Sequence, residues 1–430
     1  MYHIPYGRGE LSFDLPPGMT ATVVESRPVP PIADLPAAVR EALAAPVGTA
    51  RLRDIARPAD TVCIVFTDST RACPDALLVG PILEELLAAG VAEECITFLC
   101  GVGMHRASTD AEKIAKLGAE VVRRFRVVDH DARDPEGVVD LGRTETGIPL
   151  SVNRIAYESD LLIATGIVEP HQYAGYSGGA KTLAVGAAGE AMIAYTHGPA
   201  MLEQPGTRLG RVEGNPFREA LQEAGRRAGL RFVVNVVQDD NKRAVAVRAG
   251  DPVAAFRELV AVARSMYEVP IPHRYDAVIA GVGFPKDANL YQASRGPTYL
   301  HFAPTTVVQA GGTYILPAVC QEGAGEGAGE QRFYHALQAA TSMPALVEEL
   351  RRTGYPPGEQ RAFVLGKLLS EADIVVVGAQ TPGIVRDVKM VPAATMAEAL
   401  AWVQAKQGAA LDVLIVPHAL LTLPVVTGCC

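Results

Sequence analysis

The sequence predicts an α/β fold of two units, with parallel or mixed sheets and an active-site cleft between the units. Short apolar, β-branched runs alternate with stretches of helical periodicity, a pattern typical of sheets covered by helices. The 430 residues exceed what one hydrophobic core usually organises. A Pro-rich segment, VPIPHR, follows residue 268. We therefore expect an N-terminal unit over residues 1–268 and a C-terminal unit over residues 269–430.

In the N-terminal unit, four apolar runs predict buried strands: TVCIVFT (61–67), CITFLCG (95–101), LLIATG (161–166) and FVVNVVQ (232–238). Helical periodicity marks the stretches 34–45, 75–89, 215–228 and 251–267. Asp34, Asn215 and Asp251 are the expected N-caps, because their side chains can accept from free backbone N–H groups.

The C-terminal unit repeats the alternation. Strands are expected at YDAVIAGVG (275–283), TTVVQAGGTYIL (305–316), DIVVVG (373–378) and DVLIVP (412–417). Helices are expected near 331–352, 358–370 and 394–408. The glycine-rich segment 322–330 predicts a flexible loop that opens a helix.

Composition favours an ordinary packed protein, with 49% apolar and 20% charged residues. The net charge is -9 and no basic cluster is long enough to follow a nucleic-acid backbone. No secretory signal and no run of about 20 apolar residues is present. The seven cysteines are scattered, without a disulfide or zinc pattern, although the terminal pair Cys429 and Cys430 has no explanation. We expect a cytoplasmic protein that binds neither nucleic acid nor membrane.

Two loops that follow predicted strands carry charged side chains. FTDSTRACP (66–74) presents Asp68 and Arg71, and an Arg beside a helix start can hold a carboxylate or phosphate. An N-capping Asp with a surface Arg is the alternative interpretation. GVGMHRAST (101–109) presents His105, either as an acid or base or as a structural imidazole.

The segment IVEPHQYAGYSGGAKTLAVGAAG (167–189) is the most informative. GYSGGAKT nearly fits a P-loop, but its distance from the strand and the glycines that follow disfavour nucleotide hydrolysis. Backbone N–H groups at Gly178 and Gly179 could still cradle a phosphate beside Lys181. His171 precedes this loop and His197 follows it.

A fourth loop, GVGFPKDANLYQASRG (281–296), supplies Tyr291, Gln292 and Arg295 from across the cleft, unless it is only a polar surface loop. The cleft would then hold three histidines, one lysine and two arginines. Three imidazoles suggest a metal site, or two bases and one metal ligand, and two arginines suggest an anionic substrate. Composition alone leaves a zinc hydrolase open.

Together these segments resemble the lactate racemase family. The resemblance rests on D-x-T-R (68–71), G-x-H-x-x-x-T (103–109), H-x-Y-A-G-Y-S-G-G-A-K (171–181), His197 and P-K-D-x-N-L-Y-Q (285–292). They occur in the order and approximate spacing of the family, and the similarity covers essentially the whole chain.

The resemblance implies a nickel-pincer nucleotide, a nickel-bearing pyridinium-3-thioamide-5-thiocarboxylic acid mononucleotide, joined covalently to Lys181. His197 matches the family's nickel ligand, and His105 and His171 match its acid/base pair. Asp68, Ser177, Gly178, Gly179 and Tyr291 are the further expected cofactor contacts, and Arg71, Gln292 and Arg295 the expected substrate contacts.

The implied activity is racemisation or epimerisation of a small 2-hydroxy acid by transient hydride transfer to the cofactor. Lactate-active members usually carry a Lys where this chain has Arg295, so the choice of acid stays open. A zinc-dependent hydrolase or lyase and a non-catalytic protein that binds the cofactor or a hydroxy acid are the alternatives. The expected partners are the acid and cofactor-synthesis proteins, and the expected state is a monomer or homodimer.

Overall fold

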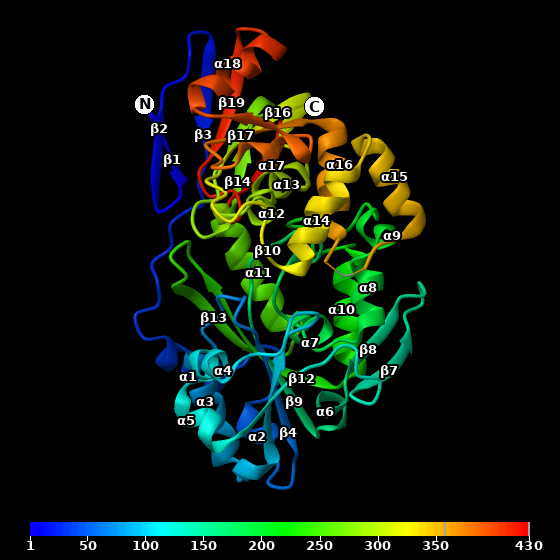
Figure 1. The fold of residues 1–430 in the computed structure, drawn as a ribbon. Coiled ribbons are helices and arrows are strands. Elements are labelled where there is room, and N and C mark those ends of the chain that lie inside the picture. Colours follow the sequence, from blue (N-terminus) through cyan, green and yellow to red (C-terminus); the bar gives the residue numbers. More distant parts are fainter. Residues whose placement is uncertain (357, 429–430) are drawn as a thin grey trace.

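The computed structural model describes residues 1–356 and 358–428 of the chain, so Cys429 and Cys430 lie outside the described residues. Two six-stranded sheets form two stacked units (Figure 1). The first sheet has the strand order β13-β12-β9-β4-β5-β6 and the second the order β18-β17-β16-β15-β19-β3. The prediction of an α/β fold with parallel or mixed sheets is confirmed.

The first sheet lies at the centre of the N-terminal unit. Its strands are β4 (Val62–Thr67), β5 (Ile96–Gly101), β6 (Arg126–Asp129), β9 (Leu161–Ile167), β12 (Leu230–Gln238) and β13 (Ala244–Gly250). Five of them run parallel, and β13 pairs antiparallel with β12. Every residue of β4 and β9 is buried, as expected for strands covered on both faces.

Helices cover both faces of this sheet. One face packs on a core that includes side chains of α1 (Leu35–Ala44), α2 (Leu52–Ile55), α3 (Asp75–Ala88), α4 (Asp110–Leu117) and α5 (Ala119–Arg124). The other face carries α6 (Arg154–Glu158), α7 (Lys181–Ala184), α10 (Pro216–Arg227) and α11 (Ala254–Tyr267). The short helices α8 (Glu190–Thr196) and α9 (Pro199–Leu202) and the hairpins β7 (Val138–Arg143) with β8 (Pro149–Asn153) and β10 (Pro170–His171) with β11 (Gly175–Tyr176) complete the unit.

The order of the first sheet reverses between β4 and β9. The chain runs outward from β4 to β5 and β6, then returns to the other side of β4 with β9. In open α/β sheets, ligands bind at the carboxyl ends of the strands beside such a reversal. The loops after β4, β5 and β9 are therefore brought together, and they are the loops that carry Asp68, His105 and His171.

The second sheet consists of β3 (Met19–Val23), β15 (Tyr275–Ala280), β16 (Val308–Pro317), β17 (Asp373–Val377), β18 (Val391–Ala393) and β19 (Leu411–Val416). All its strands run parallel. Its helices are α12 (Leu290–Ala293), α13 (Arg295–His301), α14 (Ala328–Ala339), α15 (Met343–Thr353), α16 (Gln360–Glu371), α17 (Pro382–Asp387) and α18 (Met396–Gln407). The 3-10 turns are η1 (Glu93–Cys95), in the first unit, and η2 (Lys286–Ala288).

The N-terminal strands differ from the expected division of the chain at residue 268. β3 pairs with β19, and the hairpin of β1 (Tyr2–Tyr6) and β2 (Gly9–Phe13) packs on the second unit (Figure 1). The Pro-rich segment after residue 268 contains β14 (Glu268–Ile271), which pairs with β20 (Leu423–Val426). The first strands thus add to the second sheet, a pairing across about 390 positions that local periodicity does not reveal.

Most predicted elements match the structure within a few residues. Asp34 and Asn215 cap α1 and α10 as predicted. The single helix expected over 331–352 is two helices, because Ser342 caps a new helix by accepting from a backbone N–H. Asp251 lies two residues before the assigned cap of α11, although its carboxylate still accepts from the N–H groups of the first turn.

Candidate active site

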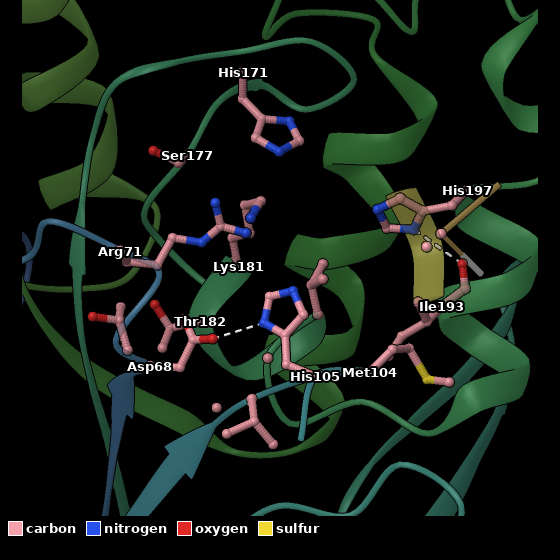
Figure 2. A pocket seen from close by; sticks show the side chains of 18 of the residues that line it. Asp68, Arg71, Met104, His105, His171, Ser177, Lys181, Thr182, Ile193 and His197 are labelled. Atoms are coloured by element: carbon pink, nitrogen blue, oxygen red, sulfur yellow. Dashed lines mark hydrogen bonds and ion pairs between the residues drawn. The ribbon is translucent and has the colours of Figure 1, made fainter. Parts of the chain in front are cut away.

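A cavity of about 400 Å³ lies between the two units, where the carboxyl ends of β4, β5 and β9 meet the second unit. Figure 2 shows the imidazoles of His105, His171 and His197 around the side chains of Arg71 and Lys181. The wall from the second unit is made by Tyr291, Ala328, Gly329, Arg332, Gly358 and Gln360. The interdomain cleft expected from the sequence is therefore present.

Asp68 and His105 form a hydrogen-bonded pair between the loops that follow β4 and β5. The Nδ1 atom of His105 lies 2.7 Å from Oδ2 of Asp68, and Thr70 donates to the other carboxylate oxygen at 2.8 Å. Burial raises the pKa of Asp68, but these hydrogen bonds and the charges of His105 and Arg71 outweigh it, so the pKa is lowered. An ionised Asp68 accepts Nδ1–H of His105, so in the neutral form of His105 the lone pair is on Nε2.

His171 ends the short strand β10 and is held in the opposite tautomer. The backbone N–H groups of Tyr173 and Ala174 donate to its Nδ1 at 3.3 and 3.1 Å. Burial first, and then the positive charges of Lys181 and Arg71, hold its pKa well below the ordinary value. His171 is therefore neutral, and its hydrogen is on Nε2.

His197 caps the C-terminus of α8. Its Nδ1 lies 3.0 Å from the carbonyl oxygen of Ile193, so Nδ1 carries the hydrogen and Nε2 carries the lone pair. Burial lowers the pKa of His197 to about 4, with the charges of Lys181 and Arg71 acting in the same direction. A neutral imidazole with a free Nε2 is the form in which histidine binds a metal ion.

Ser177 and Gly178 fix the loop that precedes Lys181 against the end of β9. The Ser177 hydroxyl donates to the carbonyl of Ile167 at 2.6 Å. Gly178 has a φ of +82°, and a Cβ at this position would lie 2.5 Å from Val168 Cγ2. Only glycine fits this turn without displacing its neighbours.

The Gly179 backbone differs from the expected phosphate cradle. Its N–H donates to Oδ1 of Asn235 at 2.7 Å, so it is not free to bind a phosphate, and Gly179 does not line the cavity. On the same side of the loop, the buried Arg218 donates to the carbonyls of Ala174 and Gly178. The hydrogen bonds of Gly179 and Arg218 therefore stabilise the loop.

Lys181 begins α7 and extends toward Arg71 in the cavity (Figure 2). Burial lowers the pKa of Lys181 to about 7, and the charges of Arg71 and Arg218 add to this effect. Near neutral pH a large fraction of this amine is unprotonated, and an unprotonated amine is the nucleophilic form.

Models of two domain families match the chain, the lactate racemase N-terminal domain over residues 6–210 and the lactate racemase C-terminal domain over residues 273–423. The chain belongs to the lactate racemase family. It is 30% identical to the lactate racemase of Thermoanaerobacterium thermosaccharolyticum over 400 residues, which is 92% of each chain. It is also 30% identical to the lactate racemase of Lactiplantibacillus plantarum over 386 residues, 89% of each chain.

Solved structures agree with this lactate racemase assignment. The lactate racemase apoprotein from Thermoanaerobacterium thermosaccharolyticum superimposes with a TM-score of 0.87 and 28% identity, covering 98% of this chain and 99% of that one. A protein from Thermotoga maritima shares the fold, with a TM-score of 0.66 at 19% identity over 91% of this chain and 98% of that one. The prediction of an isomerase of the racemase class is confirmed.

Nine of the twelve predicted site residues of this lactate racemase family member line the cavity: Asp68, Arg71, His105, His171, Ser177, Gly178, Lys181, His197 and Tyr291. Gly179, Gln292 and Arg295 do not line it. Gln292 and Arg295 lie beside Tyr291 on α12 and α13, where Arg295 donates to Tyr299 Oη at 3.0 Å.

Sequence reasoning missed Glu169 and the wall formed by the starts of α14 and α16. The glycine-rich run before α14 was the available signal, since glycines allow a close approach to a ligand. Within residues 1–356 and 358–428, no group of three or more His, Cys, Asp or Glu is placed to hold a metal ion. No helix in the same ranges is long and apolar enough to cross a membrane.

Proposed function

We propose that this chain racemises or epimerises a 2-hydroxy acid with a nickel-pincer nucleotide joined to Lys181. The observation that carries the proposal is the convergence of three imidazoles, Lys181 and Arg71 around one cavity in a lactate racemase family member. All three imidazoles leave Nε2 free, but their tautomers differ: Nδ1 faces an acceptor in His105 and His197 and backbone donors in His171.

The residues present fit this cofactor. His197 offers one neutral Nε2, a suitable ligand for nickel whose remaining ligands come from the cofactor. The lowered pKa of Lys181, about 7, leaves a substantial fraction of its amine unprotonated near neutral pH, and formation of a thioamide requires the unprotonated amine. When bound, the cofactor would supply an acceptor and donor for the hydride of the substrate carbon.

The side chains of this protein would move the proton. Nε2 of His105 receives the substrate hydroxyl proton, and the Asp68 carboxylate stabilises the imidazolium that results. His171, neutral in the unloaded protein, would take up a proton from solvent, and its imidazolium would give the Nε2 proton to the substrate oxygen on the other side of the cavity while the proton taken by His105 returns to solvent. The two histidines exchange roles when the reaction runs in reverse. Two such groups are needed because the hydroxyl groups of the two enantiomers point in different directions.

Arg71 would hold the carboxylate of the substrate through its guanidinium, which points into the cavity (Figure 2). Gln292 and Arg295, just outside the cavity in this structure, would contact the substrate from the second unit. Cofactor-synthesis proteins as partners, a monomeric or homodimeric state and a cytoplasmic location belong to the same proposal.

The test is expression of the chain together with cofactor-synthesis proteins, followed by a stereochemical screen of 2-hydroxy acids. We expect nickel, an added mass on Lys181, and inversion of a substrate whose carbon-bound deuterium is retained. Retention means that the hydrogen leaves and returns as a hydride, whereas exchange with solvent would contradict the proposal. Zinc bound to a protein with unmodified Lys181 would favour the hydrolase or lyase, and binding without turnover would favour a non-catalytic role.

A further inference from the structure

Arg361, the second residue of α16, is a buried cation that contacts only neutral groups. Its side chain is 5% exposed, and it donates to Gln172 Oε1 at 3.2 Å, Ser294 Oγ at 2.9 Å and Thr298 Oγ at 3.3 Å. Across the described ranges 1–356 and 358–428, no carboxylate forms an ion pair with it. Burial of a guanidinium without a counter-charge is costly, so its environment calls for an anion.

Several polar atoms around Arg361 are buried and lack a hydrogen-bond partner among the described residues. They are Nε of Arg361, Nε2 of Gln172 and the hydroxyls of Tyr173 and Tyr355. All four atoms carry hydrogens that they can donate. Buried donors are almost always paired in native proteins, so this cluster of donors indicates a bound group rich in acceptors.

Arg295 adds a second cation beside Arg361. It follows Ser294, whose hydroxyl accepts from Arg361, and its charge helps to lower the pKa of Arg361 after burial, the larger cause. Arg295 itself donates only to the neutral Tyr299 and Gln292, at 3.0 and 3.4 Å. Two guanidinium groups therefore share one region without a paired carboxylate in the described part of the chain.

This region adjoins the cavity. The ring centroid of Tyr291, which lines the cavity, is 5.7 Å from Cζ of Arg361. Gln172 follows His171 and Arg361 follows Gln360, and both His171 and Gln360 line the cavity. Neither arginine lines the cavity itself, so a ligand anchored at Arg71 would have to pass Tyr291 to contact them.

We propose that Arg361 and Arg295 form a second anion subsite, and that the substrate is a 2-hydroxy acid with a second carboxylate at its far end. The inference rests on the proposed function and names its substrate class. Arg71 would hold the carboxylate next to the reacting carbon, and the two arginines with the Tyr173 hydroxyl would hold the distal one. A monocarboxylic acid would leave Arg361 without a counter-charge and Arg295 with only the charge of Glu169, which forms no ion pair with it.

The test compares malate with 2-hydroxybutyrate, which has the same four-carbon chain without the second carboxylate. In the loaded enzyme, we expect kcat/KM to be at least about tenfold higher for malate. Arg361→Gln should remove that preference by lowering kcat/KM for malate and leaving the value for 2-hydroxybutyrate nearly unchanged. Arg352→Gln, at an exposed position on α15, is the matched control and should change neither value.

Three results would overturn the subsite. The wild-type enzyme could prefer 2-hydroxybutyrate. Alternatively, Arg361→Gln could lower kcat/KM equally for both substrates, which would make Arg361 a positioning residue. In the unloaded protein, inorganic phosphate could raise the melting temperature as much as malate does, which would indicate a site for free anions. If Arg361→Gln does not fold, as judged by circular dichroism, the wild-type substrate ranking and Arg295→Gln decide the question.

Failure of the subsite and failure of the proposed function give different results. If no 2-hydroxy acid is inverted, the proposed function fails, and the subsite is then judged by malate-dependent stabilisation of the unloaded protein, which Arg361→Gln should remove. If monocarboxylic acids are inverted and malate is not, the proposed function stands and the subsite is wrong.

Discussion

The two walls of the cavity are built differently. On the wall from the first sheet, each imidazole has one nitrogen fixed by a neighbouring group: a carboxylate for His105, two backbone N–H groups for His171 and a carbonyl for His197. Beside the wall from the second unit, the cations Arg295 and Arg361 hydrogen-bond only to neutral side chains among the described residues. The imidazoles of the first wall are thus fixed before a ligand binds. The two arginines of the second unit still lack an ion-pair partner among the described residues.

This difference means that the groups that transfer protons and the groups that select the substrate come from different units. Groups that transfer protons need fixed tautomers, since a rotated or wrongly protonated imidazole cannot react. Groups that select a substrate need unpaired charge facing the site. Substitutions on the first wall should therefore abolish or slow the reaction for every substrate, and substitutions on the second should change which substrate is preferred.

The largest effect should come from Lys181→Ala. Without the amine no thioamide forms, so we expect intact protein mass to show no added cofactor and racemisation to fall to background. Lys181→Arg, which keeps a positive charge but cannot form the thioamide, is the control and should also be inactive. Activity in either variant would contradict covalent attachment at this residue.

His105→Ala should lower kcat by about 10²- to 10⁴-fold, the usual contribution of a general acid or base. The loss should be similar for all 2-hydroxy acids because His105 acts on the hydroxyl group that they share. Asp68→Asn should cause a smaller loss by removing the charge that stabilises the imidazolium, and Asp54→Asn, at an exposed position, should cause none. A loss confined to one substrate would show that His105 selects substrates rather than moving the proton.

Gly178→Ala tests whether the loop of the first wall is rigid. The added Cβ would meet Val168 at 2.5 Å at a φ of +82°, so we expect the unloaded protein to lose about 1–3 kcal/mol of unfolding free energy. Gly80→Ala in α3, where a Cβ meets nothing within 4 Å, should instead leave stability unchanged or raise it slightly. Equal stability of the two variants in urea denaturation would mean that the loop adapts.

The first wall could be predicted from the sequence much better than the second. Asp68, His105 and His171 follow parallel strands, and parallel strands end at the same edge of a sheet, so local patterns were enough to bring them together. Arg361 lies inside a stretch that reads only as an amphipathic helix, and its contact with Gln172 spans 189 positions. No local pattern indicates such a contact.

Two further differences between expectation and structure have the same physical origin. The Gly179 N–H group seemed free because its acceptor, Asn235, comes from a strand 56 positions away. Residues 19–23 fall within the expected first unit, but they form β3, which pairs with β19 near the other end of the chain. Hydrogen bonds between distant segments decide both cases, and neither periodicity nor composition reports them.

Arg295→Lys should give the smallest effect and the most selective one. Lys keeps the charge but loses the planar fork that holds a carboxylate through two hydrogen bonds, so the ratio of kcat/KM values between substrates should change by several-fold while the best rate stays nearly the same. The measurement is a panel of 2-hydroxy acids with one or two carboxylates, assayed on wild type and variant with equal cofactor content. An equal loss of kcat/KM for every acid would mean that Arg295 does not select the substrate. The difference between the two walls would then depend on Arg361 alone.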